Sequence, residues 1–208
     1  MRLTDQEASR FYAAWWPLLG WINERLGIVP GVTRFPCAVE DAIAIRDALW
    51  AHDDLRVRFV AENPAGLPAD QLALVASWQH RRAGTFIVWK HHKKHTVLLG
   101  QGEAFEVVGL CSSLEEILPV APPVPVEAVL LPFEGRIVLD GLLRSYDMLI
   151  GPNMRGSLRE EYRALRARGA VLAALPKAAE AARPADAARD RGSERAVRRP
   201  RRIAPSAG

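Results

Sequence analysis

The hydrophobic pattern of the chain changes period near residue 85, and this change constrains the fold more than any other feature of the sequence. Before it, apolar residues recur every three or four positions, which is typical of amphipathic helices. After it, β-branched and aromatic runs, beginning with TFIVW at 85–89, are separated by turn signals, which indicates strands. A run of helices followed by a run of strands predicts an α+β fold.

The first helix is predicted at residues 4–26. Thr4 and Glu7 form a capping box at its start, Gly27 ends it, and Pro17 is expected to kink or break it. Its apolar face is the stripe Tyr12, Trp15, Trp16, Leu19 and Ile22. Aromatic residues at helical spacing are more often core than ligand platform, so we expect this stripe to pack inside the protein.

Three further helices are predicted before the strands begin. Two short ones cover residues 38–52 and 54–63, and the last begins at Pro68 and is closed by Gly84. Residues 1–84 are therefore expected to form a helical part.

The strand-rich part opens with a hairpin. Residues 85–101 are predicted to form two antiparallel strands joined by the basic tip HHKK. A third strand is expected at 104–110, followed by a short helix that Ser113 and Glu116 cap.

Two turn signals further along predict a three-stranded meander. They lie at residues 132–135 and at the Asp140-Gly141 pair, which is typical of a two-residue hairpin loop. Asp140 is thus explained by turn chemistry and surface exposure. A last helix is expected at 153–169, with a capping box at Ser157 and Glu160, before a possible closing strand.

These elements predict one α+β domain over residues 1–175. Its helical part packs on an antiparallel, meander-rich sheet or small barrel at 85–175, which ends with one helix. Residues 176–208 consist mainly of Ala, Arg and Pro and are expected to be a disordered tail, because they have too little apolar surface to offset the entropy of ordering.

The positive charge is concentrated in that tail. The chain has a net charge of +4, but nine basic and four acidic residues give positions 176–208 a charge of +5, which leaves −1 for the rest. A nearly neutral body has no broad nucleic-acid footprint, whereas the tail could bind phosphates through counterion release.

The sequence favours a reducing cytoplasm. Its two cysteines, Cys37 and Cys111, form neither a disulfide framework nor a thiolate metal motif. No apolar run approaches the roughly 20 residues of a membrane span, so we expect no membrane association. No cofactor motif is found, since GQGEAF at 100–105 lacks the later glycine of a phosphate-binding loop.

The segment KHHKKHT at 90–96 is the densest group of chemically active side chains. His91, His92 and His95 are candidate metal ligands, although neighbouring lysines would repel a cation and a tetrahedral site needs four donors. The same tip could instead contact nucleic acid. The candidate phosphate-binding residues are Lys90, Lys93 and Lys94 in the tip and Arg198, Arg199, Arg201 and Arg202 in the tail.

Evidence for catalysis is weak. No nucleophile elbow is present, and a cysteine beside Leu110 is more often a small buried hydrophobe than a nucleophile. Glu127 shares a strand face with Val129 and would be a buried acid needing a partner, for which Arg136 and Arg144 are candidates.

Several segments, namely ENPAGL, ASWQHRRAGTF, HTVLLG and VEAVLLPFEGRIVLDGLL, resemble a family of uncharacterised bacterial proteins. The resemblance covers about residues 10–175. It implies bacterial origin and a single domain, and it implies no activity.

Three functions remain open. The first is a non-enzymatic module that binds an unidentified protein partner through an exposed sheet edge or a groove between helices and sheet. The second is a nucleic-acid-associated protein that uses the tail and the hairpin tip, with His91, His92 or Trp89 stacking on a base. The third is a metal-dependent hydrolase that uses the histidines and a carboxylate.

Overall fold

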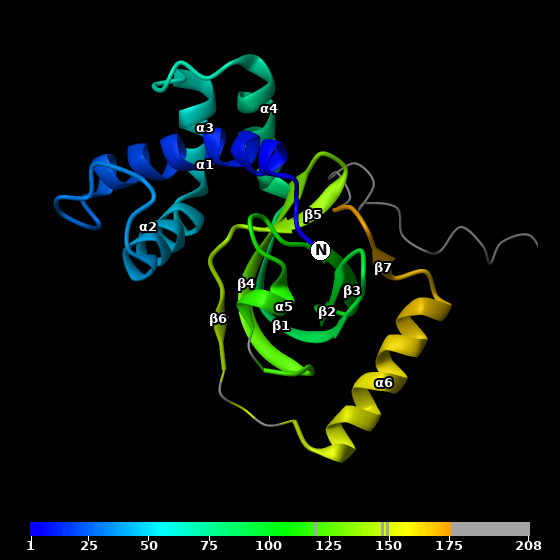
Figure 1. Cartoon of the computed structure of the whole chain (residues 1–208). Helices are drawn as coiled ribbons and strands as arrows, with labels where there is room; N and C mark the ends of the chain where they lie inside the picture. The colour runs from blue at the N-terminus through cyan, green and yellow to red at the C-terminus, as the bar shows by residue number, and fades with distance from the viewer. Residues whose placement is uncertain (119, 147, 149, 176–208) are drawn as a thin grey trace, which may run out of the picture. The chain divides into compact units, whose positions relative to one another are not determined.

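The computed structural model describes residues 1–118, 120–146, 148 and 150–175 (Figure 1). The helices come first, as predicted: α1 (Asp5–Leu26), α2 (Val39–Ala51), α3 (Asp53–Glu62) and α4 (Ala69–Ser77), then the 3-10 turn Trp78–His80. The capping box of α1 is confirmed. Glu7 N donates to Thr4 Oγ1 at 3.3 Å and Thr4 N donates to Glu7 Oε2 at 2.8 Å. α1 runs through Pro17 without a break.

The helical part ends before Gly84, so this boundary prediction was wrong. The fully buried Trp78 begins the tight 3-10 turn after α4, and β1 already starts at Arg82. Gly84 lies inside that strand with a φ of 146°, a backbone conformation that suits glycine. A glycine inside a strand was thus mistaken for a helix end.

Five strands close into a small barrel: β1 (Arg82–His91), β2 (Thr96–Gly100), β3 (Glu103–Val108), β4 (Val124–Phe133) and β5 (Arg136–Leu139). Their order is β1-β2-β3-β5-β4, and β4 pairs back with β1. The β3–β5 pair is parallel, and α5 (Leu114–Ile117) joins β3 to β4. Small five-stranded barrels occur in proteins of unrelated functions, so the fold alone does not define a function.

The predicted meander is corrected by the strand pairing. β6 (Arg144–Ser145) pairs with β4 and not with β5, so Asp140-Gly141 is no hairpin loop. The chain leaves the barrel there because the Asp140 carboxylate accepts from Leu142 N at 3.0 Å and from Arg46 of α2. These bonds fix the turn from outside the sheet.

The last helix, α6 (Pro152–Ala167), begins earlier than predicted. Gly151 and Pro152 start it, and Ser157 lies within it, donating to Asn153 O at 3.3 Å instead of capping. Proline is well suited to a first helical position. The closing strand is present as β7 (Val171–Leu172), parallel to β3.

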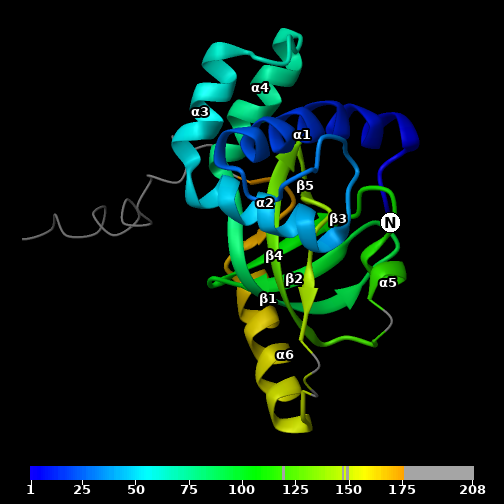
Figure 2. The same ribbon diagram turned by 90° about the vertical axis from the view of Figure 1, so that its left-hand side faces the viewer.

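Helices cover two separate outer faces of the barrel. α1–α4 pack on residues of β4 and β5, including Leu131, Phe133 and Val138, while α6 covers Val97 and Leu99 of β2. Figures 1 and 2 show α6 lying away from α1–α4, past the barrel. The expected α+β architecture, with N-terminal helices, a small barrel and one following helix, is confirmed. The predicted tail at 176–208 lies outside the described residues.

Candidate nucleic-acid interface

The hairpin tip, residues 90–96, is a tight basic turn. His92 N donates to His95 O at 2.8 Å, and the strand register shifts between Val88 and Lys90. Such a bulge redirects the side chains that follow it. The lysines of the tip, Lys90, Lys93 and Lys94, are all exposed to solvent.

The three histidines of the tip do not act together. His91 is half-buried, and its Nδ1 is hydrogen bonded to Thr96 Oγ1 at 2.9 Å within the hairpin. His92 and His95 face each other with ring centroids 5.0 Å apart, and His95 Nδ1 lies 3.6 Å from Glu106 Oε2. Burial lowers the pKa of His91 and, with the nearby His95 and Lys90, that of His92.

Metal binding by His91, His92 and His95 receives no support from this geometry. A zinc site needs three or four donors about 2.0–2.2 Å from one point. Across residues 1–175, apart from 119, 147 and 149, no group of three or more His, Cys, Asp or Glu side chains is placed to hold a metal ion.

A row of arginines runs along α6, and its last member, Arg166, lies next to the hairpin tip. Its members are spaced by three and four residues and therefore share one side of the helix: Arg155, Arg159, Arg163 and Arg166. All four are exposed, and in the described part of the chain none forms an ion pair. We call this set the arginine row. The spacing of these arginines is visible in the sequence of the last helix, but the arginine row was not predicted.

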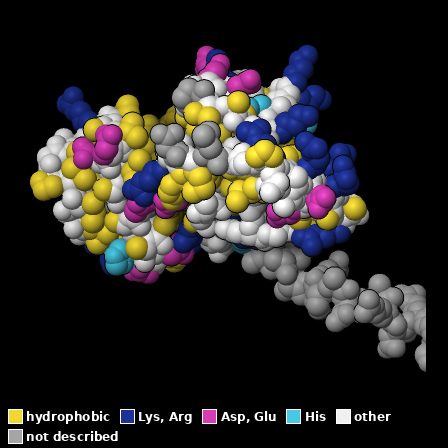
Figure 3. Space-filling view, turned by 90° about the horizontal axis from the view of Figure 1, so that it is seen from below, with side chains coloured by type: hydrophobic (Ala, Val, Ile, Leu, Met, Phe, Trp, Pro, Cys, Tyr) yellow, Lys and Arg dark blue, Asp and Glu magenta, His cyan; other side chains and the backbone are white. Residues whose placement is uncertain are grey.

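One open cavity shows that the tip adjoins Arg166, the last member of the arginine row. It has a volume of about 430 Å³ and is lined by His92 and His95 from the tip, Glu106 from β3, Tyr162 and Arg166 from α6, and Val171 from β7. We call it the tip cavity. Figure 3 shows Lys and Arg side chains gathered on the right of that view, with Asp and Glu side chains among them. Segments some 70 residues apart in sequence thus line one cavity, in which Arg166 and Glu106 are the charged residues besides the two histidines.

A second cleft lies beside Tyr12 and Cys111. It has a volume of about 190 Å³ and is otherwise lined by residues such as Leu139 and Gly141, without a histidine or carboxylate side chain. Cys111 is exposed, so the prediction of a buried cysteine was wrong. Burial, the Cys111 thiol and Asp140 raise the pKa of Tyr12. A thiol with no adjoining base lacks the partner that nucleophilic catalysis requires.

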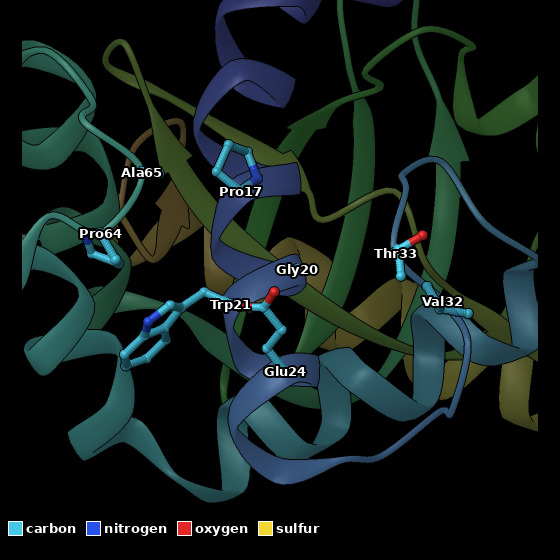
Figure 4. Close-up of a pocket in the computed structure, with 8 residues that line it drawn as sticks. All are labelled: Pro17, Gly20, Trp21, Glu24, Val32, Thr33, Pro64 and Ala65. Atoms are coloured by element: carbon cyan, nitrogen blue, oxygen red, sulfur yellow. The ribbon is translucent and has the colours of Figure 1, made fainter.

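A third cleft of about 270 Å³ runs along the exposed side of α1 near Pro17. Figure 4 shows its walls: Trp21 reaches toward Pro64, while Val32 and Thr33 stand on the other side of α1. Glu24 is the one charged residue among those that line it. The residues that line this cleft indicate no particular ligand or reaction.

The acid that sequence reasoning misplaced is Asp140. Its carboxylate is fully buried and accepts from Arg46 Nη1 at 2.8 Å, and the same Nη1 donates to Leu142 O at 2.9 Å. Burial raises the pKa of Asp140 to about 6, against the opposing effect of Arg46. Arg46 also contacts Asp47, its Nε lying 2.8 Å from Oδ1. The pair joins α2 to the end of β5 and lines none of the three cavities described above, so we interpret it as structural.

Glu127 is less buried than predicted. Its side chain is 41% exposed, with Oε2 3.6 Å from Arg144 Nη1 and 3.2 Å from Tyr146 Oη, which donates to it. Arg144 is thus the partner, whereas Arg136 pairs with Glu7 at 2.6 Å. A half-exposed, paired acid does not mark a catalytic base.

The remaining predicted contacts, Arg198, Arg199, Arg201 and Arg202, lie outside the described residues. No described helix is long and apolar enough to cross a membrane. Comparison with known proteins gave no match: no family model, no curated protein and no solved structure is significantly similar to the chain.

Proposed function

We propose that the protein binds single-stranded nucleic acid through the hairpin tip and the arginine row, assisted by the basic tail. The observation that carries this proposal is that the hairpin tip and Arg166, the last member of the arginine row, line one cavity although they are distant in sequence. Lysine and arginine side chains held side by side neutralise successive phosphates and release the counterions condensed on them.

The arrangement around the tip cavity suits a flexible strand better than a rigid duplex. Tyr162 is a half-buried ring beside Arg166, whose Cζ lies 6.0 Å from the ring centre. Proteins that hold single strands combine a positively charged groove with aromatic side chains on which bases stack. In OB barrels the outer face of β2 and β3 binds such ligands, but here α6 covers it, so the contacts must come from α6 and the tip.

Binding of a protein partner, the first function considered, has less support. Barrel closure pairs each of β1–β5 on two sides, and the described strands paired on one side, β6 and β7, are two residues long. The space between α1–α4 and the barrel is filled by core residues such as Trp15, Trp78 and Phe133. The described strands therefore offer no long open edge, and the cleft lined by both α1 and the barrel, beside Tyr12 and Leu139, has a volume of only about 190 Å³.

The test is charge reversal in the full chain. Arg159→Glu with Arg163→Glu should weaken binding to fluorescent single strands longer than about 16 nucleotides, the upper site size of a single OB fold. The slope of log K against log salt should become shallower by about 0.7 for each phosphate that the protein no longer neutralises. Fluorescence anisotropy at several salt concentrations measures both.

A matched control variant carries the same change of charge in the helical part. Arg34→Glu with Arg58→Glu alters two exposed arginines far from the tip and should leave the salt slope unchanged. Alanine at Arg198, Arg199, Arg201 and Arg202 tests the tail separately. Equal effects of the two charge-reversed pairs, or no binding by the unaltered chain at low salt, would refute the proposal.

A further inference from the structure

We propose that the tip cavity receives one unstacked guanine of the bound strand, with Glu106 reading its Watson–Crick edge. This inference rests on the proposed function and specifies which strands are preferred. The cavity volume of about 430 Å³ lies within the range of about 300–1,000 Å³ that small-molecule sites occupy.

An aromatic ring and an apolar residue supply stacking surface in this cavity. Tyr162 packs against Trp89 with ring centroids 6.4 Å apart, and Val171 is half-buried on the neighbouring strand. Arg166 stands 6.0 Å from the Tyr162 ring centre, at the outer limit of a cation–π contact of about 6 Å. The ring is thus not tightly covered, and every nucleobase presents a face that can stack on it.

The carboxylate of Glu106 distinguishes this cavity from a plain phosphate site. Its side chain is 32% exposed and lines the cavity beside His95. An ionised carboxylate accepts hydrogen bonds and repels phosphate, so a group that binds directly to Glu106, whose Oε2 lies 3.6 Å from His95 Nδ1, must present N–H donors. The arginines and lysines outside the cavity would hold the flanking phosphates.

Guanine matches the carboxylate better than the other bases do. Its Watson–Crick edge carries two adjacent N–H donors, the ring imino group and the 2-amino group, which together suit the two oxygens of one carboxylate. Thymine and uracil offer one donor between two acceptors, and cytosine and adenine offer an amino group beside an acceptor nitrogen. Bases of single strands are commonly recognised on this edge.

The experiment uses the full chain and compares alternating thymine–guanine strands with strands in which hypoxanthine replaces guanine. Hypoxanthine lacks the 2-amino group and so removes one donor while keeping the stacking surface. The unaltered protein should bind the guanine strand about tenfold more tightly, a ratio that corresponds to about 1.4 kcal/mol. RNA and DNA versions of each strand show which sugar is preferred.

Glu106→Gln should abolish the difference between guanine and hypoxanthine strands. Glu103→Gln, which changes the same charge on the same strand outside the cavity, should preserve it. Tyr162→Leu keeps an apolar side chain against Trp89 and should weaken binding to both strands by a similar factor of about ten. Tyr146→Leu, a half-exposed tyrosine next to β6, is its control.

The outcomes separate this inference from the proposed function. Salt-dependent binding without a guanine preference would overturn the guanine site and leave the basic interface in place. If Glu106→Gln strengthened binding to every strand by the same factor as Glu103→Gln, Glu106 would be a repulsive charge and not a reader of bases. Thermal unfolding of each variant checks that the fold is retained.

Discussion

The two covered faces of the barrel are built in different ways. On the face under α1–α4, the rings of Phe11, Trp15, Trp78 and Phe133 are buried to 1% exposure or less and contact one another. On the face under α6, the helix contributes two buried leucines, Leu158 and Leu165, and a half-buried Tyr162. The contact of α1–α4 with the barrel is thus large and aromatic, whereas the contact of α6 with the barrel involves few side chains.

Charge follows the same division. Under α1–α4 the one deeply buried carboxylate of the described residues, Asp140, is paired with Arg46 and closed to solvent. On α6 the charged side chains of the arginine row are exposed, and one of them, Arg166, lines a cavity. Changes in the first face should therefore alter stability, whereas changes at the rim of the second should alter binding. The following predictions test this separation, beginning with the largest effect.

Trp15→Ala should be the most damaging substitution. Trp15 is fully buried and lies against three aromatic rings, with centroids 5.4 Å away for Trp78 and 5.9 Å for Phe11 and Trp50. Removing a ring of this size costs about 3–5 kcal/mol of unfolding free energy, and the packed surroundings favour the upper end. Denaturant unfolding followed by fluorescence measures the change.

Trp15→Phe is the matched control for this prediction. The indole N–H of Trp15 has no hydrogen-bond partner among the described residues, so phenylalanine removes an unpaired polar group along with part of the volume. We expect Trp15→Phe to lower the free energy of unfolding by less than half as much as Trp15→Ala does. Equal losses for the two variants would show that the ring does not support this face.

Arg46→Met should have the next largest effect. Its free energy of unfolding should fall by about 3 kcal/mol at pH 8, because the substitution leaves the Asp140 carboxylate buried without its cation. The pKa of Asp140 is already raised to about 6 by burial, so its folded form binds a proton more tightly than the unfolded chain does. Its ionisation therefore lowers stability as pH rises from about 4 through 6. The loss of unfolding free energy caused by Arg46→Met should therefore be smallest at pH 5 and largest above pH 6.

Unfolding of the variant at several pH values tests this dependence. The double variant Arg46→Met with Asp140→Asn should recover part of the loss at pH 8, since it removes the unpaired charge. A cost of Arg46→Met that is the same at pH 5 and pH 8 would contradict the prediction.

Elements with local signals could be predicted from the sequence, and elements fixed by distant partners could not. The capping boxes at Thr4 and Ser113 and the hairpin that carries the tip depend on neighbouring residues. Closure of the barrel by β1 and β4, and the pairing of β6 with β4, join segments far apart in the chain. Turn signals alone could not show that Asp140-Gly141 leaves the sheet.

The candidate site was predictable in part for the same reason. The basic tip is a local feature, but the approach of α6 to it depends on packing between segments some 70 residues apart in sequence. The sequence does carry one signal of the buried pair: Arg46 occupies an apolar helix position near Ile43 and Leu49, and an arginine there requires a partner for its charge. The partner, 94 residues away, could not be chosen from sequence.

Leu165→Ala should have an intermediate effect on stability and a distinct effect on binding. Leu165 is 2% exposed and holds α6 against Val97 and Leu99 of the barrel. We expect a loss of about 2 kcal/mol, the lower end for leucine, because this contact involves few side chains and can relax. Hydrogen exchange should accelerate in α6 more than in α1.

The same variant links the second face to the proposed interface. A loosened α6 displaces the arginine row from the hairpin tip, so affinity for single strands should fall even though no charge has changed. Leu55→Ala, in the helical part, is the control, since it should reduce stability without reducing affinity at temperatures where the protein is folded. Unchanged affinity in Leu165→Ala would separate α6 from the interface.

Glu7→Gln should have the smallest effect, confined to a window of pH. Hydrogen bonds from Arg136, at 2.6 Å, and from Thr4 lower the pKa of Glu7 to about 2. Because the folded pKa lies below the unfolded value of 4.5, its stabilising contribution is present above about pH 4.5 and is lost as pH falls toward 2. The denaturation midpoints of Glu7→Gln and the unaltered chain should therefore differ at neutral pH and converge near pH 2. Arg136→Met should reproduce the difference, and a gap that persists at low pH would mean that another interaction of Glu7 stabilises this end of α1.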